Sequence, residues 1–412
     1  MEPHTFLFQL VLILVAARLF GELAAYFRIP SVIGELVAGI ILGPSILGLI
    51  EINYIIQLLA QIGIILLLFE VGVETDLGNL TSVGGKAILV ASVGVILPFI
   101  LGFIVSYNVF DFSILPSLFI ASTLTATSIG ITLRVIRDLK KQNSKEAHII
   151  VGAAILDDII GIVLLAMLYE FSVSGEINLW NAGKVLFFVM LFFIVSPILA
   201  KGISLIIKKW DENSEIPGLL PTTIVALILF FAWIAHELGA PELLGGFAAG
   251  LALSRKFYFP YATIIPDSRE FSERVEAQMK PIIHLFTPIF FVATGLALDL
   301  RNVDWNSMYI WLLTGGLLLA AIIGKLLSGL VLNGEKWKMK FIIGTAMIPR
   351  GEVGLIFANV GLTAGAIKDD VYTSLILVIT FTTLVAPFCL RWLYGSTPDH
   401  ERIENGKINV EV

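Results

Sequence analysis

The chain has 412 residues, of which 57% are hydrophobic and only 15% are charged, and its mean hydropathy is +0.91. An ordinary soluble domain is about half apolar and a quarter charged, so this composition excludes a soluble enzyme, a nucleic-acid-binding protein and a disordered chain. The formal net charge of −6 is a poor guide, because in a membrane protein the placement of charge is more informative than its sum.

Apolar runs separated by proline, glycine and charge clusters predict an all-α polytopic membrane protein with about 13 spans of roughly 20 residues each. The first run lacks a basic leader and a cleavage site, which indicates a true span. We expect the polar stretch 258–280 to form an interfacial helix on one membrane face. The predicted spans are 6–27, 31–49, 54–75, 86–107, 114–136, 146–170, 183–207, 218–236, 241–256, 282–299, 308–332, 339–361 and 371–394.

The basic residues predict the orientation of these spans. Most of the 27 Lys and Arg residues fall in one alternating set of connections, which the positive-inside rule assigns to the cytoplasm. We therefore expect a multi-pass protein of the plasma membrane with its N-terminus outside and its C-terminus in the cytoplasm. The exceptions are Lys184, Arg301 and Lys368 on the opposite side, and Arg18, Lys325 and Arg350 within spans.

Two pairs of similar segments lie seven spans apart. GELVAGIILG (34–43) resembles GGFAAGLAL (245–253), and FEVGVETDL (69–77) resembles FVATGLALDL (291–300). Since seven is odd, matching segments cross the membrane in opposite directions, which is the pattern of an inverted repeat. The alternative is a chance likeness between glycine-rich helices. The repeat predicts one transporter domain made of a first repeat (1–170), a linker span (171–217), an inverted second repeat (218–394) and a short cytoplasmic tail (395–412), without a soluble regulatory domain.

Two adjacent carboxylates, Asp157 and Asp158, fall about halfway along the sixth predicted span. A charge at the bilayer centre costs about 2.5–3.5 kcal/mol on the mildest scale, so it needs a partner or a water-filled cavity. Neighbours on a helix point about 100° apart, so one carboxylate can face a cavity while the other faces a neighbouring helix. We take both as candidate ion-binding residues. The alternative is a permanently buried pair that serves stability.

Lys325, near the middle of the eleventh span, is the natural counter-charge for one of these aspartates. The alternative is that its ammonium group snorkels to the interface. Other acidic residues near span ends are expected to be solvated or interfacial, namely Glu35, Glu70, Glu74 and Glu237.

Two predicted spans are interrupted. The fifth contains TLTATSIGIT (123–132), with five hydroxyl side chains around a glycine, and the twelfth contains TAMIPRGEVG (345–354). They occupy corresponding places in the two predicted repeats. Broken helices that cross at mid-membrane expose carbonyl and N–H groups, which are the usual ingredients of a transporter site.

The polar residues of these interruptions have two readings each. Thr127 and Ser128 are candidate site residues, although hydroxyl-rich helices also use such groups for packing. Arg350 and Glu352 are candidates to neutralise the broken helix ends or to pair with each other, which is a structural role, and a direct role in transport is the alternative.

Taken together, these segments resemble the monovalent cation:proton antiporter-2 family over nearly the whole chain. Among its members, the sequence is most similar to sodium:proton antiporters with paired aspartates. It differs from the glutathione-gated potassium efflux systems, which have Gln before a single aspartate and carry a cytosolic nucleotide-binding domain. The motifs that carry the resemblance are PSVIGELVAGIILGP (30–44), LLLFEVGVETDL (66–77), TATSIGITLRVI (125–136), ILDDIIGI (155–162), IGKLLSGL (323–330) and MIPRGEVGLI (347–356).

The resemblance implies a homodimer whose core domain moves against a dimerisation domain in an elevator-like motion. It implies that Asp158 is the main carboxylate shared by Na⁺ and protons, that Asp157 is the partner of Lys325, and that Thr127 and Ser128 line the site. Transported Na⁺ would therefore bind at Asp157 and Asp158, with no other metal or cofactor, and Lys325 would act as charge partner or proton carrier.

The resulting hypothesis is a secondary antiporter, not an enzyme, that exchanges Na⁺ or Li⁺ for H⁺ in a lipid bilayer and has no nucleic-acid partner. K⁺/H⁺ antiport within the same family and Na⁺-coupled symport of a small organic anion are the alternatives. An intramembrane aspartyl protease needs carboxylates on two facing helices and a GxGD motif, and neither pattern is present in the sequence.

Overall fold

The computed structural model describes residues 3–27, 29–75, 82–174, 179–213, 216–254, 269–301 and 303–395, and every regular element in these ranges is a helix. The elements, in chain order, are α1 (Pro3–Tyr26), α2 (Ser31–Leu42), α3 (Tyr54–Glu74), α5 (Gly84–Ile104), the π-helical turn η1 (Val105–Val109), α6 (Ile114–Thr123), α7 (Ile129–Asp138), α8 (Lys145–Ser174), α9 (Leu179–Glu212), α10 (Leu219–Glu237), α11 (Glu242–Ala252), α12 (Arg269–Leu296), α13 (Met308–Leu330), α14 (Trp337–Ala346), α15 (Glu352–Thr363) and α16 (Asp369–Gly395).

The predicted all-α polytopic membrane fold is confirmed. Within the described ranges, nine helices are long and apolar enough to cross a membrane, namely α1, α3, α5 with η1, α8, α9, α10, α12, α13 and α16. Two further predicted spans correspond to the short apolar helices α2 and α11. The last two correspond to the interrupted pairs α6/α7 and α14/α15, whose breaks fall inside the predicted interruptions.

The prediction of an interfacial helix over 258–280 is wrong for its second half. Residues 258–268 lie outside the described residues, whereas 269–280 form the first turns of α12, which continues without interruption to Leu296. Phe271, Val275 and Met279 follow one another at four-residue spacing and are all buried. This apolar stripe holds the polar-looking segment against the protein, since residues four apart share one face of a helix.

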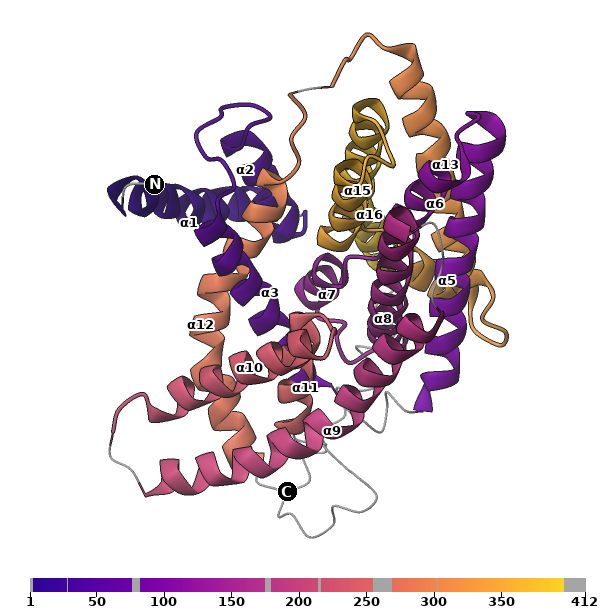
Figure 1. The fold of residues 1–412 in the computed structure, drawn as a ribbon. Helices are drawn as coiled ribbons and strands as arrows, with labels where there is room; N and C mark the ends of the chain where they lie inside the picture. The colour runs from indigo at the N-terminus through magenta and orange to yellow at the C-terminus, as the bar shows by residue number, and fades with distance from the viewer. Residues whose placement is uncertain are drawn as a thin grey trace, which may run out of the picture.

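The helices divide into two groups by packing (Figure 1). We call α1–α3 with α10–α12 the scaffold group, because α3 packs on α11 and α12, α2 packs on α1 and α12, and α10 packs on α11. We call α5–α8 with α13–α16 the site bundle, because α5 packs on α8 and α13, α13 on α14 and α16, and α6 on α15. The long helix α9 contacts α8 on one side and α10 and α11 on the other, and it therefore bridges the two groups.

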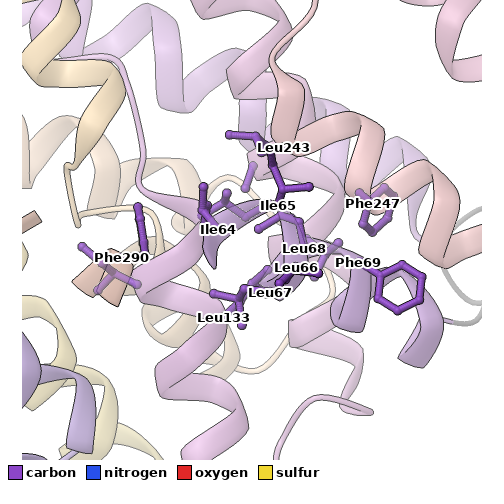
Figure 2. Packing of buried hydrophobic residues seen from close by; sticks show 14 of the residues in the cluster. Ile64, Ile65, Leu66, Leu67, Leu68, Phe69, Leu133, Leu243, Phe247 and Phe290 are labelled. Carbon is purple, nitrogen blue, oxygen red and sulfur yellow. The ribbon is translucent and has the colours of Figure 1, made fainter. Parts of the chain in front are cut away.

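The buried core of the scaffold group is centred on α3 (Figure 2). The consecutive run from Ile64 to Phe69 is buried along its whole length, between Phe247 of α11 and Phe290 of α12. Leu133 of α7 joins the same cluster, so α7 is one of the site-bundle helices that reach this core. A helix that is apolar on all sides in this way is one enclosed by other helices.

Glycines allow the backbones of the scaffold group to touch. A Cβ on Gly39 would lie 2.1 Å from the Val292 carbonyl oxygen, and a Cβ on Gly250 would lie 2.1 Å from the Phe69 carbonyl oxygen. No real side chain fits at that distance, so both contacts require glycine. Two more contacts of this kind join Gly34 to the carbonyl of Phe20 and Gly245 to the carbonyl of Phe231.

Candidate functional site

Two interrupted helices cross inside the site bundle. The chain leaves α6 at Thr123 and re-enters a helix at Ile129 in α7, and it leaves α14 at Ala346 and re-enters a helix at Glu352 in α15. Each break exposes the carbonyl end of one half-helix and the N–H end of another. Such ends carry partial charges of about half an elementary charge, so they attract ions and charged side chains.

Hydrogen bonds tie the two breaks to each other. The Ser128 N–H donates to the Pro349 carbonyl over 2.8 Å, and the Thr127 hydroxyl donates to the Met347 carbonyl over 3.2 Å. The Ser128 hydroxyl is buried and has no hydrogen-bond partner among the described residues. A Cβ on Gly351 would lie 2.7 Å from this oxygen, so glycine is what lets the second break approach Ser128 so closely. Ser128 therefore offers a buried, available oxygen at the crossing.

The buried side chain of Arg350 contacts both breaks at the crossing. Its side chain is fully buried, and Nη1 donates to the Ile348 carbonyl over 2.7 Å. Nη2 donates to the carbonyl of Leu124, the residue that directly follows α6, and the Thr383 hydroxyl of α16 donates to the Arg350 carbonyl. A cation at two carbonyl ends is the favourable placement for a helix dipole. The structure thus places the guanidinium group of Arg350 at carbonyl groups of both breaks. Glu352 is the first residue of α15, and its side chain lies outside what the structure describes.

The structure brings Lys325 and Asp157 together. Lys325 Nζ on α13 lies 3.2 Å from Asp157 Oδ2 and 3.4 Å from Oδ1 on α8, and neither side chain is more than 1% exposed. Gly94 on α5 lies beside this ammonium group, since a Cβ there would be in ordinary van der Waals contact with Nζ, at 3.7 Å. The lysine therefore does not snorkel to an interface. It is enclosed with an opposite charge, as the cost of a lone buried ion demands.

Asp158 is also buried, with 4% of the residue exposed. It follows Asp157 on α8 and therefore points about 100° away around the helix axis. Helix α8 packs against α6, α7, α14 and α15, so the acidic pair and the crossing lie on directly contacting elements. The site thus combines two buried carboxylates, one buried ammonium group, buried hydroxyl groups and the carbonyl ends of broken helices.

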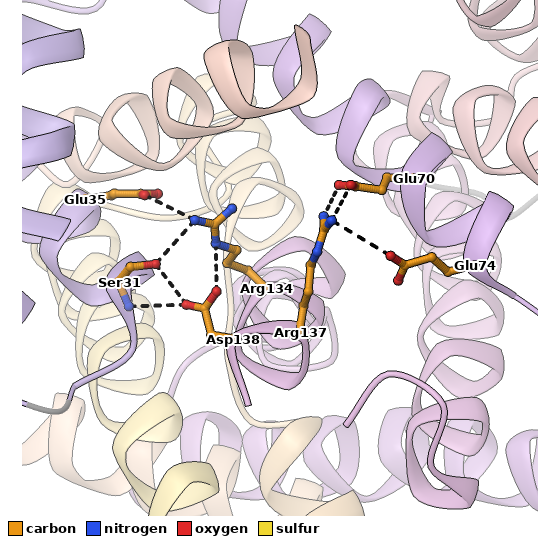
Figure 3. Close-up of polar contacts among 7 residues, drawn as sticks. All are labelled: Ser31, Glu35, Glu70, Glu74, Arg134, Arg137 and Asp138. Atoms are coloured by element: carbon orange, nitrogen blue, oxygen red, sulfur yellow. Dashed lines mark hydrogen bonds and ion pairs between the residues drawn. The ribbon is translucent and has the colours of Figure 1, made fainter. Parts of the chain in front are cut away.

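The predicted exposure of two acidic residues is wrong. Glu35 on α2 and Glu70 on α3 were expected to be solvated or interfacial, and the structure instead buries both, with 2% exposed. Figure 3 shows their partners: Arg137 of α7 donates two hydrogen bonds to the Glu70 carboxylate, and Arg134 of α7 lies 3.5 Å from Glu35. No local spacing in the sequence indicated these partners, because α7 is far from α2 and α3 along the chain.

Interrupted helices that cross within a membrane-spanning helical bundle, beside buried ionisable groups, define the class of secondary transporters. The chain belongs to the sodium/hydrogen exchanger family, whose transmembrane region matches residues 10–394. It is therefore a multi-pass membrane protein of a transporter family, and the family membership expected from its motifs is confirmed.

Relatives cover the chain almost end to end. It is 33% identical to the high-affinity Na⁺/H⁺ antiporter NhaS3 of Synechocystis sp., over 97% of this chain and 92% of that protein. It is also 33% identical to the Na⁺/H⁺-K⁺ antiporter GerN of Bacillus cereus, over 95% of this chain and 97% of that protein. Its fold resembles the sodium proton antiporter MjNhaP1 of Methanocaldococcus jannaschii, with a TM-score of 0.72 and 18% identity, over 97% of this chain and 99% of that one.

Proposed function

We propose that the protein exchanges Na⁺ (or Li⁺) for protons across a membrane, with cation and protons competing for Asp158 and Asp157. The observation that carries the proposal is the buried Lys325–Asp157 pair with a second buried carboxylate next to it, on a helix that packs against the crossing. The names of the relatives NhaS3 and GerN support Na⁺/H⁺ exchange as the activity.

Competition for one set of oxygens is sufficient to couple the two fluxes. Na⁺ is a hard cation that prefers oxygen ligands, and the site offers the Asp158 carboxylate and the buried hydroxyls of Thr127 and Ser128. A proton needs the same carboxylate oxygen. Loading one cargo therefore excludes the other, and either cargo reduces the charge that must pass an apolar barrier.

Lys325 has a defined part in this cycle. While Asp157 holds the ammonium group, the charges of both are balanced inside the protein. If the incoming cation recruits the Asp157 carboxylate, the lysine loses its partner, and a buried ammonium group without a partner readily releases its proton. Exchange of that proton for the cation makes Lys325 the proton carrier in this scheme.

The proposed motion is an elevator-like movement of the site bundle against the scaffold group within a homodimer. The inverted repeat is supported by matching backbone contacts: Gly34 on Phe20 has its counterpart in Gly245 on Phe231, and Gly39 on α12 has its counterpart in Gly250 on α3. With the charge asymmetry of the loops, we place the protein in the plasma membrane with its N-terminus outside and its C-terminus in the cytoplasm.

K⁺ is the second candidate cation, because the relative GerN is named a Na⁺/H⁺-K⁺ antiporter. The same carboxylate and hydroxyl oxygens would serve either ion. Proteoliposomes loaded with each cation in turn discriminate the two, since the transported ion dissipates an imposed proton gradient and the other ion leaves it intact.

The test of the proposed function is Asp158→Asn in proteoliposomes that contain a pH-sensitive dye. We expect Na⁺-driven proton movement to disappear, because asparagine neither ionises nor carries a proton. Asp304→Asn is the matched control, since Asp304 is exposed in the loop before α13 and asparagine can still accept the hydrogen bond from the Asn306 N–H. Proton movement that persists in Asp158→Asn at the rate of the control overturns the assignment.

A further inference from the structure

The end of α7 is joined to the scaffold group by ion pairs that the exchange chemistry does not use. Arg137 binds Glu70 through both guanidinium nitrogens and lies 3.8 Å from Glu74, all on the side of α3 (Figure 3). Two parallel N–H···O bonds of this kind fix the orientation as well as the distance of the two groups. The contact is therefore specific to one relative position of α7 and α3.

A second set of contacts lies on the other side of α7, against α2. Arg134 lies 3.5 Å from Glu35 and 3.3 Å from Asp138 on its own helix. Asp138 in turn accepts a hydrogen bond of 2.8 Å from the Ser31 hydroxyl and one of 3.2 Å from the Ser31 N–H, at the first residue of α2. These groups, with Arg137, Glu70 and Glu74, are the α7 ion-pair cluster.

The cluster spans the boundary between the two helix groups. Its carboxylates on α2 and α3 belong to the scaffold group, whereas α7 starts at the crossing and belongs to the site bundle. Closer to the crossing, the contact between the groups is apolar: Ile64 and Phe290 of the scaffold group pack directly against the backbone of Gly130. Apolar contacts of this kind have no fixed bonding direction, whereas the ion pairs of the cluster do, so the cluster is the directional contact between α7 and the scaffold group.

Burial makes these ion pairs a barrier. Glu35 and Glu70 are almost completely enclosed, so their carboxylates cannot part from the arginines without water or another partner entering. The arginine side chains are less enclosed, at 13% for Arg134 and 20% for Arg137. Arg134 also keeps Asp138, four residues on, as a partner within α7. If α7 moves away from α2 and α3, Asp138 therefore still compensates part of its positive charge, while Glu35 and Glu70 remain in the scaffold group.

We propose that the α7 ion-pair cluster is a latch that holds the site bundle in one position against the scaffold group and sets the rate at which the loaded site crosses. Arg134, Arg137, Glu35 and Glu70 are positioning residues in this scheme, because they act on the movement of the site and do not touch its cargo. The inference rests on the proposed function, since it assumes that the two groups move relative to each other during exchange.

The direct test locks the latch with a disulfide. Ser31→Cys with Asp138→Cys in a Cys389→Ser background places two thiols where a serine and an aspartate already touch, and Cys389 is the free cysteine to be removed. We expect oxidation to lower the exchange rate roughly tenfold or more, and reduction to restore it. Na⁺-dependent thermal stabilisation should persist in the oxidised protein. Full exchange by protein with the disulfide verified by mass overturns the latch.

The complementary test removes charge. Glu70→Gln should change the maximal exchange rate several-fold while the Na⁺ concentration for half-maximal rate stays within about twofold, because the cargo site is untouched. The charge-swapped pair Glu70→Arg with Arg137→Glu should return the rate toward that of the unaltered protein. The matched control is Glu335→Gln, which removes ion pairs to Lys86 and Lys145 that lie wholly within the site bundle, and it should leave the rate unchanged.

The outcomes separate the latch from the proposed function. If the unaltered protein exchanges no cation for protons, the proposed function fails and the latch with it. If the unaltered protein exchanges Na⁺ and Glu70→Gln behaves like Glu335→Gln, the proposed function stands and the latch is overturned. If Glu70→Gln and the charge-swapped pair both change only the half-saturating Na⁺ concentration, the cluster contributes to cation binding, and this too overturns the latch.

Discussion

Lys325 and Asp157 form a buried ion pair across α13 and α8, with 3.2 Å between Nζ and Oδ2. The two residues are 168 positions apart, so the contact depends on the whole arrangement of the site bundle. A buried ion pair adds little net stability, but removal of one partner leaves an uncompensated charge and is strongly destabilising. The pair therefore makes the two helices interdependent.

The first prediction follows from this asymmetry. Lys325→Gln should destabilise the protein by about 3–5 kcal/mol, because Asp157 is then buried without its counter-charge. Asp157→Asn added to the same chain should recover most of that loss, since both charges are then absent. Thermal unfolding of the purified variants in one detergent measures this. A double variant that unfolds at the temperature of Lys325→Gln would contradict it.

The second prediction concerns Arg350. Arg350→Gln should cost about 2–4 kcal/mol in stability, because two buried carbonyl groups at the crossing lose a charged donor. The stability of Arg350→Lys should lie between those of Arg350→Gln and the unaltered protein. Its ammonium group restores the charge, but it cannot donate to both carbonyl groups as the guanidinium group does. Unfolding temperatures and exchange rates should decline in the same order. If Arg350→Lys matches the unaltered protein in unfolding temperature and in exchange rate, the two separate guanidinium donors are not needed.

The third prediction tests the glycine contacts of the scaffold group. Gly39→Ala and Gly250→Ala should each destabilise by about 1–3 kcal/mol or more, because the new methyl group meets a carbonyl oxygen that belongs to a packed helix. Gly202→Ala is the control. It lies on α9 with nothing within 4 Å of the added Cβ, and alanine favours a helix by about 0.5–1 kcal/mol. Equal unfolding temperatures for all three variants would refute the close-contact reading.

The fourth prediction concerns pH. Hydrogen bonds from Lys145 and Lys86 lower the pKa of Glu335, in the loop between α13 and α14, below its ordinary value of 4.5. A depressed pKa in the folded state means that these contacts stabilise fully above pH 4.5, and that the stabilisation is lost as the pH falls through the lowered value. Glu335→Gln should therefore be less stable than the unaltered protein at neutral pH and should converge with it in acid. Unfolding temperatures measured from pH 7 downwards test this, and a gap that widens in acid would have the wrong sign.

Periodicity and charge were enough to predict much of the fold. Each predicted apolar segment coincides with a helix or with an interrupted pair, because a membrane requires long apolar runs whatever their neighbours are. Lys325 and Asp157 could be singled out for the same reason, since charge in mid-span is costly enough to need a partner. The segment 269–280 was misassigned because its many charges concealed the buried stripe of Phe271, Val275 and Met279.

The pairwise contacts could not be predicted. Glu35 and Glu70 find their arginines 99 and 67 residues along the chain, and no local spacing indicates which distant helix supplies the partner. In the same way, the side chain of Arg350 donates to the carbonyl of Leu124, 226 residues earlier. The two interruptions and their crossing were predicted from the sequence, but the side chain that joins them was not.

The separation of Lys325 from Asp157 in the chain has a consequence for biosynthesis. Helix α8 emerges from the ribosome well before α13, so both aspartates enter the membrane while their future counter-charge has not yet been made. Two ionised carboxylates without a partner are energetically unfavourable in lipid. The acidic helix must therefore stay in a watery or protein-lined place, or enter protonated, until α13 arrives. Assembly of this site is thus a late event in synthesis, and a chain that ends before residue 325 cannot complete it.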